Sequence, residues 1–89
     1  MIQIEFQFFG GMRPYALHGE EAKLSFKEPL CVNEIKVILG KKLSSKFGSI
    51  FSQQFLSECA FANEKKVLNQ NDLINVSSVI AILPPVCGG

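Results

Sequence analysis

The chain has 89 residues, 47% of them hydrophobic, with eight Phe and no Trp. This composition excludes a disordered tail, and at this length only about 60% of the unfolded surface can be buried, which supports a single core. Nine basic and eight acidic residues leave a formal net charge of +1, so no strong positive field attracts nucleic acid or an anionic membrane. We therefore expect one domain with neither nucleic acid nor a membrane as its partner.

The sequence also carries no targeting signal that we can identify. Its apolar runs stay below the ~18 residues of a membrane-spanning helix. The start, "MIQIEFQFF", lacks the charged region and cleavage site of a signal peptide. We expect a cytoplasmic protein.

The first half of the chain predicts a hairpin followed by a helix. Residues 2–9, "IQIEFQFF", alternate apolar and polar side chains, and so do residues 22–28, "AKLSFKE". This period of two predicts two strands with one apolar face each. Between them, "GGMRP" at 10–14 breaks any regular element, so the strands should form an antiparallel hairpin with a longish loop.

After Pro29 the apolar residues recur at spacings of three and four, which predicts an amphipathic helix. The stripe consists of Val32, Ile35, Leu39 and Leu43, and Val37 and Ile38 widen it. Gly40 lies inside this stripe and lowers the stability of a helix by about 1 kcal/mol relative to Ala. The helix is therefore expected to fray or end early there. Residues 47–56 are left open between a helical turn and a loop.

The second half predicts three more strands. They are "SECAFA" at 57–62, a short edge strand "KKVL" at 65–68, and "VSSVIAIL" at 76–83. The last is almost continuously apolar, which is typical of a strand in mid-sheet. One helix crossing a mixed sheet of about four or five strands, with the last strand parallel to the first, is the α+β arrangement called the β-grasp. We expect this domain at 1–83 and a flexible tail at 84–89.

The three cysteines, Cys31, Cys59 and Cys87, form no C-x-x-C pair, and His18 is the one other soft ligand. Neither a disulfide framework nor a metal site follows from this pattern. We expect Cys31 and Cys59 to be small buried residues and His18 to lie on the surface.

The end of the chain, "ILPPVCGG" at 82–89, is the segment best suited to chemistry. Pro84 and Pro85 fix φ and favour an extended rod, and six residues at about 3.3 Å each reach ~20 Å. Gly88 and Gly89 lack Cβ atoms, so their backbone fits a narrow channel in another protein. The terminal carboxylate is then the reactive group. The alternative is an idle, frayed terminus.

Several stretches carry a resemblance to a known family. "IAILPPVCGG" resembles the end of the molybdopterin synthase small subunit, a ubiquitin-like sulfur carrier whose members typically finish in Pro-Pro-Val-small-Gly-Gly. "IQIEFQFFGGMR" is similar to that family's first strand and loop, "VNEIKVIL" to its helix, and "AFANEKKVL" to its third strand and turn.

The resemblance implies that Gly89 is the site of reaction and Gly88 its neighbour in the channel. A ubiquitin-activating-type adenylyltransferase would adenylate the carboxylate with ATP, and a persulfide donor would convert it to a thiocarboxylate. The sulfur would then enter a pterin precursor, in molybdenum cofactor biosynthesis, within the active site of the large subunit. The chain itself would be a non-catalytic sulfur donor that binds no cofactor.

Partner contacts would come from the end of the last strand and the tail: Ile82, Leu83, Pro84, Pro85, Val86 and Cys87. Phe8 and Phe9 are further candidates for partner contact, because the expected arrangement places them close to the tail. Two departures from the family concern docking to the large subunit. Ser77, Ser78 and Val79 replace the family's Gly-Asp-Glu type of turn before the last strand. Ile82 and Leu83 likewise replace two aromatic residues that often precede the prolines.

Three alternatives stay open. One is a sulfur carrier for thiamine synthesis or another thiolation pathway, since those carriers also end in Gly-Gly, although the Pro-Pro-Val sequence favours the molybdopterin type. A ubiquitin-like modifier would instead form an isopeptide bond to a lysine. A plain interaction domain would leave the tail unused. Cys87, which stands where a small residue is usual, is either a tolerated side chain or a thiol that captures the activated carboxyl group or tethers a partner.

Overall fold

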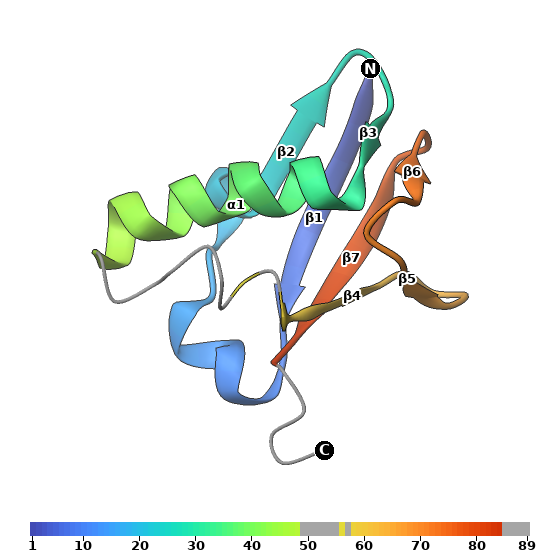
Figure 1. Ribbon diagram of the computed structural model, residues 1–89. Helices are drawn as coiled ribbons and strands as arrows, with labels where there is room; N and C mark the ends of the chain where they lie inside the picture. The colour runs from blue at the N-terminus through green and yellow to red at the C-terminus, as the bar shows by residue number, and fades with distance from the viewer. Residues whose placement is uncertain (49–55, 57, 85–89) are drawn as a thin grey trace.

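The computed structural model describes residues 1–48, 56 and 58–84. A five-stranded mixed sheet in the order β2-β1-β7-β4-β5 is crossed on one face by the helix α1 (Figure 1). The strands of this sheet are β1 (Ile2–Phe8), β2 (Lys23–Phe26), β4 (Ala60–Ala62), β5 (Val67–Leu68) and β7 (Ser78–Leu83). This is the α+β architecture that the sequence predicts.

The last strand lies in the middle of the sheet. β7 runs parallel to β1, with Ile4 opposite Ser78 and Phe8 opposite Ile82, and antiparallel to β4 on its other side. β1 pairs antiparallel with β2. The predicted hairpin, the mid-sheet position of the last strand and the edge position of β5 are all confirmed.

The helix α1 (Val32–Phe47) buries the predicted stripe of Val32, Ile35, Leu39 and Leu43. The assignment of Val37 to this stripe is wrong, because Val37 is 41% exposed. The expectation that the helix ends near Gly40 is wrong, because the helix continues to Phe47 and Gly40 itself is buried. Packing against the sheet outweighs a propensity cost of about 1 kcal/mol. The helix ends at Gly48, whose N–H donates to the Ser44 carbonyl at 2.9 Å and whose φ of 84° favours glycine.

The loop between β1 and β2 contains two short 3-10 helices, η1 (Gly10–Tyr15) and η2 (Gly19–Ala22). The expectation that "GGMRP" excludes regular structure is therefore wrong. Met12 is buried in η1 and anchors it to the core, which stabilises a short element that its Gly and Pro content disfavours. Ala22 belongs to η2, so the second strand begins one residue later than the alternation suggests.

A second, two-stranded sheet pairs β3 (Leu30–Cys31) with β6 (Leu73–Ile74). The sequence does not predict this sheet, because two-residue strands carry no measurable period. The loop before β6 also covers the start of α1. The N–H groups of Val32 and Asn33 donate to the carbonyls of Asp72 and Gln70 at 2.9 and 3.0 Å.

The predicted strand at 57–62 is wrong in its first part. Leu56 and Glu58 are helical, and the Cys59 N–H donates to the Leu56 carbonyl at 3.1 Å. The strand is therefore restricted to Ala60–Ala62. Most of the segment left open at 47–56 lies outside the described residues.

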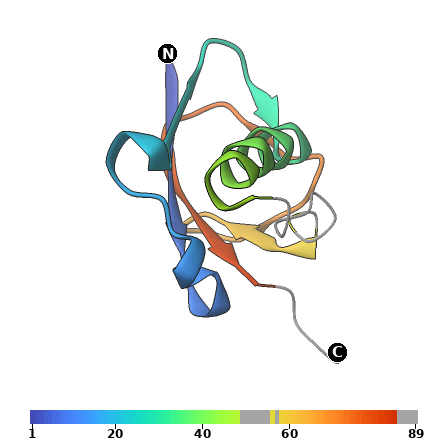
Figure 2. The same cartoon turned by 90° about the vertical axis from the view of Figure 1, so that its left-hand side faces the viewer.

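The hydrophobic core fills the space between α1 and the inner face of the sheet (Figure 2). Phe6 of β1 and Phe61 of β4 meet edge to face at 6.3 Å between ring centroids, a geometry favoured by their ring quadrupoles. Within the described part of the chain, no helix has the length and apolar character that crossing a membrane requires.

Candidate functional site

The candidate site lies where β7 ends. Leu83 is the last residue of the strand, and Pro84 is the last residue described before the end of the chain. The other predicted site residues lie outside the described part of the structure: Pro85, Val86, Cys87, Gly88 and Gly89.

The end of β7 is held from both sides. On one side, the Phe9 N–H donates to the Ile82 carbonyl at 3.1 Å, beyond the last residue of β1. On the other side, Leu83 is opposite Ala60 of β4. The chain therefore leaves the domain from a fixed point between two neighbouring segments.

Gly10 lies near Pro84, the first residue of the tail. Its φ is +57°, and a Cβ added to it would lie 3.5 Å from both Cδ and Cγ of Pro84. The bare face of the glycine is thus directed at the proline ring.

The prediction that Ile82 contacts a partner is wrong for its side chain. Ile82 has 0% of its surface exposed and lies opposite Phe8 and Phe61 in the register, with its side chain in the core. Phe8 is buried as well. An almost continuous apolar run does not reveal which residues point inward, and the alternation in β7 assigns Ile80 and Ile82 to the core.

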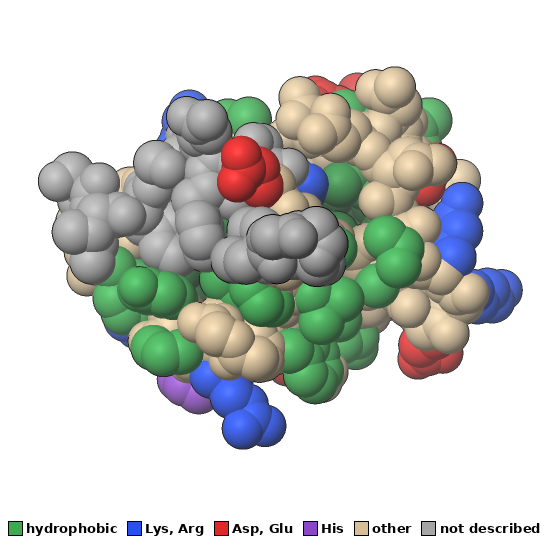
Figure 3. All heavy atoms as spheres, turned by 60° about the horizontal axis from the view of Figure 1, so that its bottom comes forward, with side chains coloured by type: hydrophobic (Ala, Val, Ile, Leu, Met, Phe, Trp, Pro, Cys, Tyr) green, Lys and Arg blue, Asp and Glu red, His purple; other side chains and the backbone are tan. Residues whose placement is uncertain are grey.

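The remaining apolar residues of this region lie on the opposite face of the sheet. We call them the outer apolar patch: Val79, Ala81 and Leu83 of β7, Ala60 and Ala62 of β4, and Val67 of β5. The register places Ala62 between Ala81 and Val67, and Val67 is 62% exposed. Phe9, at 39% exposed, adjoins the end of β7. Figure 3 shows this end of the molecule, with hydrophobic side chains gathered over it.

Such a patch next to the tail suits a protein partner, because buried interface centres are depleted in charge. The same face changes character on β1, where Gln3, Glu5 and Gln7 are exposed. The patch therefore occupies the half of the sheet from which β7 leads into the tail.

Lys36 and Cys59 form a buried polar contact beneath β4. The Lys36 Nζ donates to the Cys59 carbonyl at 2.8 Å and lies 5.1 Å from the Phe61 ring centroid. Burial lowers the pKa of Lys36 and raises the pKa of the Cys59 thiol to about 11. A thiol with this pKa is a poor nucleophile at neutral pH, so the role of the contact is structural.

Cys59 is buried, as expected, whereas the expectation for Cys31 is wrong. Cys31 is half-buried and caps α1: its side chain accepts the Glu34 N–H, and its own N–H donates to Glu34 Oε1 at 3.1 Å. Cysteine is an unusual residue at the N-cap of a helix. In the sequence, only the Glu three residues later indicates this cap.

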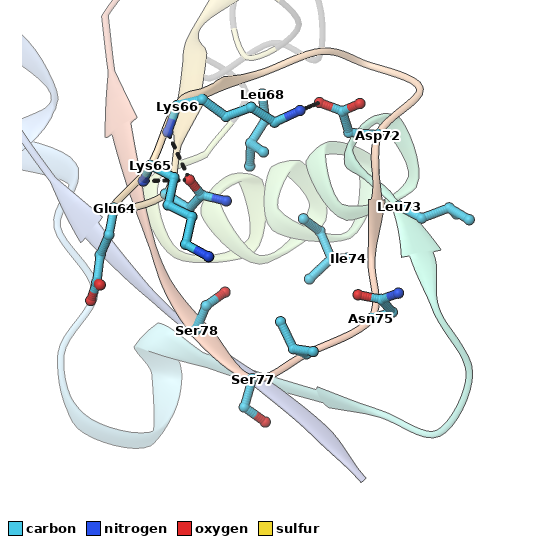
Figure 4. A pocket seen from close by; sticks show the side chains of 12 residues that line it. Glu64, Lys65, Lys66, Leu68, Asp72, Leu73, Ile74, Asn75, Ser77 and Ser78 are labelled. Carbon is cyan, nitrogen blue, oxygen red and sulfur yellow. Dashed lines mark hydrogen bonds and ion pairs between the residues drawn. The ribbon is translucent and has the colours of Figure 1, made fainter.

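A hollow of about 360 Å³ lies at the opposite end of β7, lined by the turn at 63–66 and by residues 72–78. In Figure 4, Lys66 reaches across to Asp72 while Glu64 points away. The ion pair measures 3.4 Å, and the Asp72 carboxylate also accepts the Asn69 N–H at 2.8 Å. That hydrogen bond is the main cause of the lowered pKa of Asp72. The ion pair also links the turn at 63–66 to the segment at 72–78.

His18 and Ser77 have surface or structural positions. His18 is exposed, as expected, and Ser77 Oγ accepts the Gln3 N–H at 2.9 Å. Among the residues that the structure describes, no group of three or more His, Cys, Asp or Glu side chains gathers as metal ligands would.

Comparison with known proteins supports the fold. No protein-family model matches the sequence, and no curated protein sequence matches it. The structure is similar to the crystal structure of SAMP1 from Haloferax volcanii, with a TM-score of 0.58 and 16% sequence identity over 98% of this chain and 99% of that chain. The chain thus has the β-grasp fold that the sequence predicts.

Proposed function

We propose that the protein is a cytoplasmic, ubiquitin-like sulfur carrier that reacts through the carboxylate of Gly89. Its specific role is that of the small subunit of molybdopterin synthase, which donates sulfur to a pterin precursor. The proposal rests on one observation: a fixed mid-sheet strand, bordered by an outer apolar patch, leads directly into a Pro-Pro-Val-Cys-Gly-Gly sequence.

The chemistry follows from the terminus. A carboxylate is a poor electrophile until one of its oxygens becomes part of a good leaving group. The Gly89 carboxylate attacks the α-phosphorus of ATP, and pyrophosphate leaves. A persulfide sulfur of the donor then attacks the acyl carbon and AMP leaves. A thiol then attacks the donor-side sulfur of the resulting acyl disulfide, which forms a new disulfide and releases the thiocarboxylate. A ubiquitin-activating-type enzyme supplies the ATP site, and the chain itself holds no cofactor.

The domain supplies recognition. The outer apolar patch, together with Phe9, docks the activating enzyme and the large subunit in turn, while Pro84 and Pro85 direct the terminus into the partner's active site. The large subunit provides the basic groups for sulfur transfer. Gly88 and Gly89 lack side chains that would obstruct the approach of those groups.

The experiment compares the full chain with a variant lacking Gly89. Each is incubated with a ubiquitin-activating-type adenylyltransferase and ATP, and pyrophosphate release is measured. We expect release with the full chain and loss of release without Gly89, at unchanged thermal stability. Equal release from both chains would overturn the proposal.

The products separate a carrier from a modifier. With a persulfide donor present, a carrier yields a thiocarboxylated monomer. A ladder of larger conjugates on addition of other proteins would instead favour a ubiquitin-like modifier.

A further inference from the structure

The outer face of the sheet contains a hollow of about 280 Å³ within the outer apolar patch. We call it the outer hollow, and the residues that line it are Gln7, Ala62, Asn63, Glu64, Val79 and Ala81. It is the part of the patch that can enclose a side chain of a partner, whereas the rest of the patch offers a surface without walls.

The pairing of the strands explains why the surface is hollowed here. One row across the sheet consists of Gln7, Ala81, Ala62 and Val67, on β1, β7, β4 and β5. Two small side chains thus lie between two longer ones. Neighbouring strands are about 4.8 Å apart, so the outer members of the row are ~14 Å apart, which leaves room for one side chain of the size of Leu or Phe.

The outer hollow is apolar on the side toward the end of β7. Leu83 lies opposite Ala60 in the register, and it follows Ala81 by two residues on the same face of the sheet. Phe9 is 39% exposed, and its N–H donates to the carbonyl of Ile82. An apolar group seated in the outer hollow would meet further apolar surface in this direction.

The opposite side of the outer hollow is acidic. Glu64 lines it together with Val79, and Glu5 lies opposite Val79 on the neighbouring strand. Both glutamates are exposed. Among the residues that the structure describes, no Lys or Arg lines the outer hollow. The surface is therefore asymmetric, with apolar side chains toward the end of β7 and carboxylates on the other side.

The nearest lysines in the sequence and the register do not cancel this asymmetry. Lys23 is opposite Glu5 but on β2, one strand farther from the outer hollow, and its ammonium lies 3.9 Å from the Glu20 carboxylate. In Figure 4, the Lys65 side chain points into the hollow at the other end of β7, whereas Glu64 points away from that hollow.

We propose that the outer hollow receives one apolar side chain from a segment of the activating enzyme in which Arg or Lys residues flank that side chain. The basic groups would pair with Glu5 and Glu64. This inference rests on the proposed function and deepens it, because it states the chemistry of the partner segment. It also fixes the orientation of docking, since a reversed segment would place its basic groups against Phe9 and Leu83.

The first experiment measures KM of the full chain for the activating enzyme at low and high salt. Replacing both carboxylates by amides, in Glu5→Gln with Glu64→Gln, should raise KM about threefold to tenfold at ~50 mM salt. At ~300 mM salt the difference should become smaller, because screening already weakens the attraction in the unmutated chain.

The matched control removes the same charge elsewhere. Glu20 and Glu28 are exposed and lie outside the outer apolar patch, so Glu20→Gln with Glu28→Gln should leave KM as in the unmutated chain at both salt concentrations. Equal KM values for the two double variants would overturn the inference.

The second experiment does not depend on adenylation. The isotope-labelled full chain is titrated with the blocked peptides Ac-Arg-Leu-Leu-Arg-NH2 and Ac-Glu-Leu-Leu-Glu-NH2, and the amide NMR signals are followed. We expect the signals of Ala62, Val79 and Ala81 to shift with the basic peptide and not with the acidic one. The variant Ala81→Leu, whose longer side chain fills the outer hollow, should abolish these shifts.

The peptide titration separates this inference from the proposed function. No shift of these signals, or equal shifts with both peptides, would overturn the inference even if the chain is adenylated. A lack of adenylation of the unmutated chain would overturn the proposed function, and the titration would then be the test of the outer hollow as a site for basic, apolar segments.

Discussion

The buried ammonium group of Lys36 donates a hydrogen bond to the main-chain carbonyl of Cys59 at 2.8 Å. The contact joins the middle of α1 to the residue that precedes β4, and β4 is one of the two strands that hold β7. A charged side chain that is 6% exposed thus supports the strand beside the exit of the tail.

We predict that Lys36→Met lowers the free energy of unfolding by about 1–3 kcal/mol, because a charge-assisted hydrogen bond is lost. The Met side chain retains much of the apolar stem, so a larger loss is not expected. Urea denaturation measures the change. Lys41→Met, an exposed neighbour on the same helix, should change stability by less than ~0.5 kcal/mol, and equal losses for the two variants would contradict the role of Lys36.

The same contact predicts an alkaline pH dependence. The pKa of Lys36 in the folded state lies below its ordinary value of 10.5, so between the two values the unfolded chain binds more protons and stability rises with pH. The pKa of Cys59 is raised from 9.0 to about 11, so between these values the folded chain binds more protons and stability falls with pH. The two effects oppose each other.

Removing Lys36 should therefore expose the effect of Cys59. In Lys36→Met, stability should fall more steeply between pH 9 and pH 11 than in the unmutated chain, because the opposing rise is absent. In Lys36→Met with Cys59→Ala, the steeper fall should disappear. Urea unfolding across this range tests both statements, and parallel pH profiles for all chains would contradict them.

The two described cysteines should differ in reactivity. In a Cys87→Ser background, we expect the half-buried Cys31 to react with a thiol reagent in the folded protein. Cys59, which is 2% exposed and has a raised pKa, should react only as the chain unfolds. Mass spectrometry over time measures the two rates. Modification of both thiols at the same rate would argue against the burial of Cys59.

The outer apolar patch predicts a docking defect. Val67→Asp adds a charge at an exposed position of β5 and should raise KM for the activating enzyme about tenfold or more, with kcat and thermal stability little changed. Ser25→Asp adds the same charge on the exposed face of the other edge strand, β2, and should leave KM unchanged. If both variants bind as the unmutated chain does, the partner docks elsewhere.

The sequence predicts the long periodic elements well, because their apolar faces are buried against one common core. The helix over Val32–Phe47 and the alternation in β1 are of this kind. It does not predict β3 and β6, which are too short to show a period and form through pairing between distant segments. Gly40 is misjudged because local propensity ignores the packing that holds the helix.

The candidate site is predictable in part. The composition of the tail predicts a reactive terminus, but the direction of the Ile82 side chain depends on strand register, which an apolar run leaves undefined. Likewise, nothing in the spacing of Gly10 and Pro84 indicates that they lie near each other. Their proximity results from the parallel pairing of the first and last strands, which brings η1 to the end of β7.

The most direct test of the central claim, that the terminal carboxylate is the reacting group, is the intact mass of the full chain. The chain is incubated with the activating enzyme, ATP, a persulfide donor and a reductant, and the reaction is then quenched. We predict a mass gain equal to the replacement of one oxygen atom by sulfur, located by fragmentation at Gly89. An unchanged mass, or sulfur located on a cysteine side chain instead, would contradict the account.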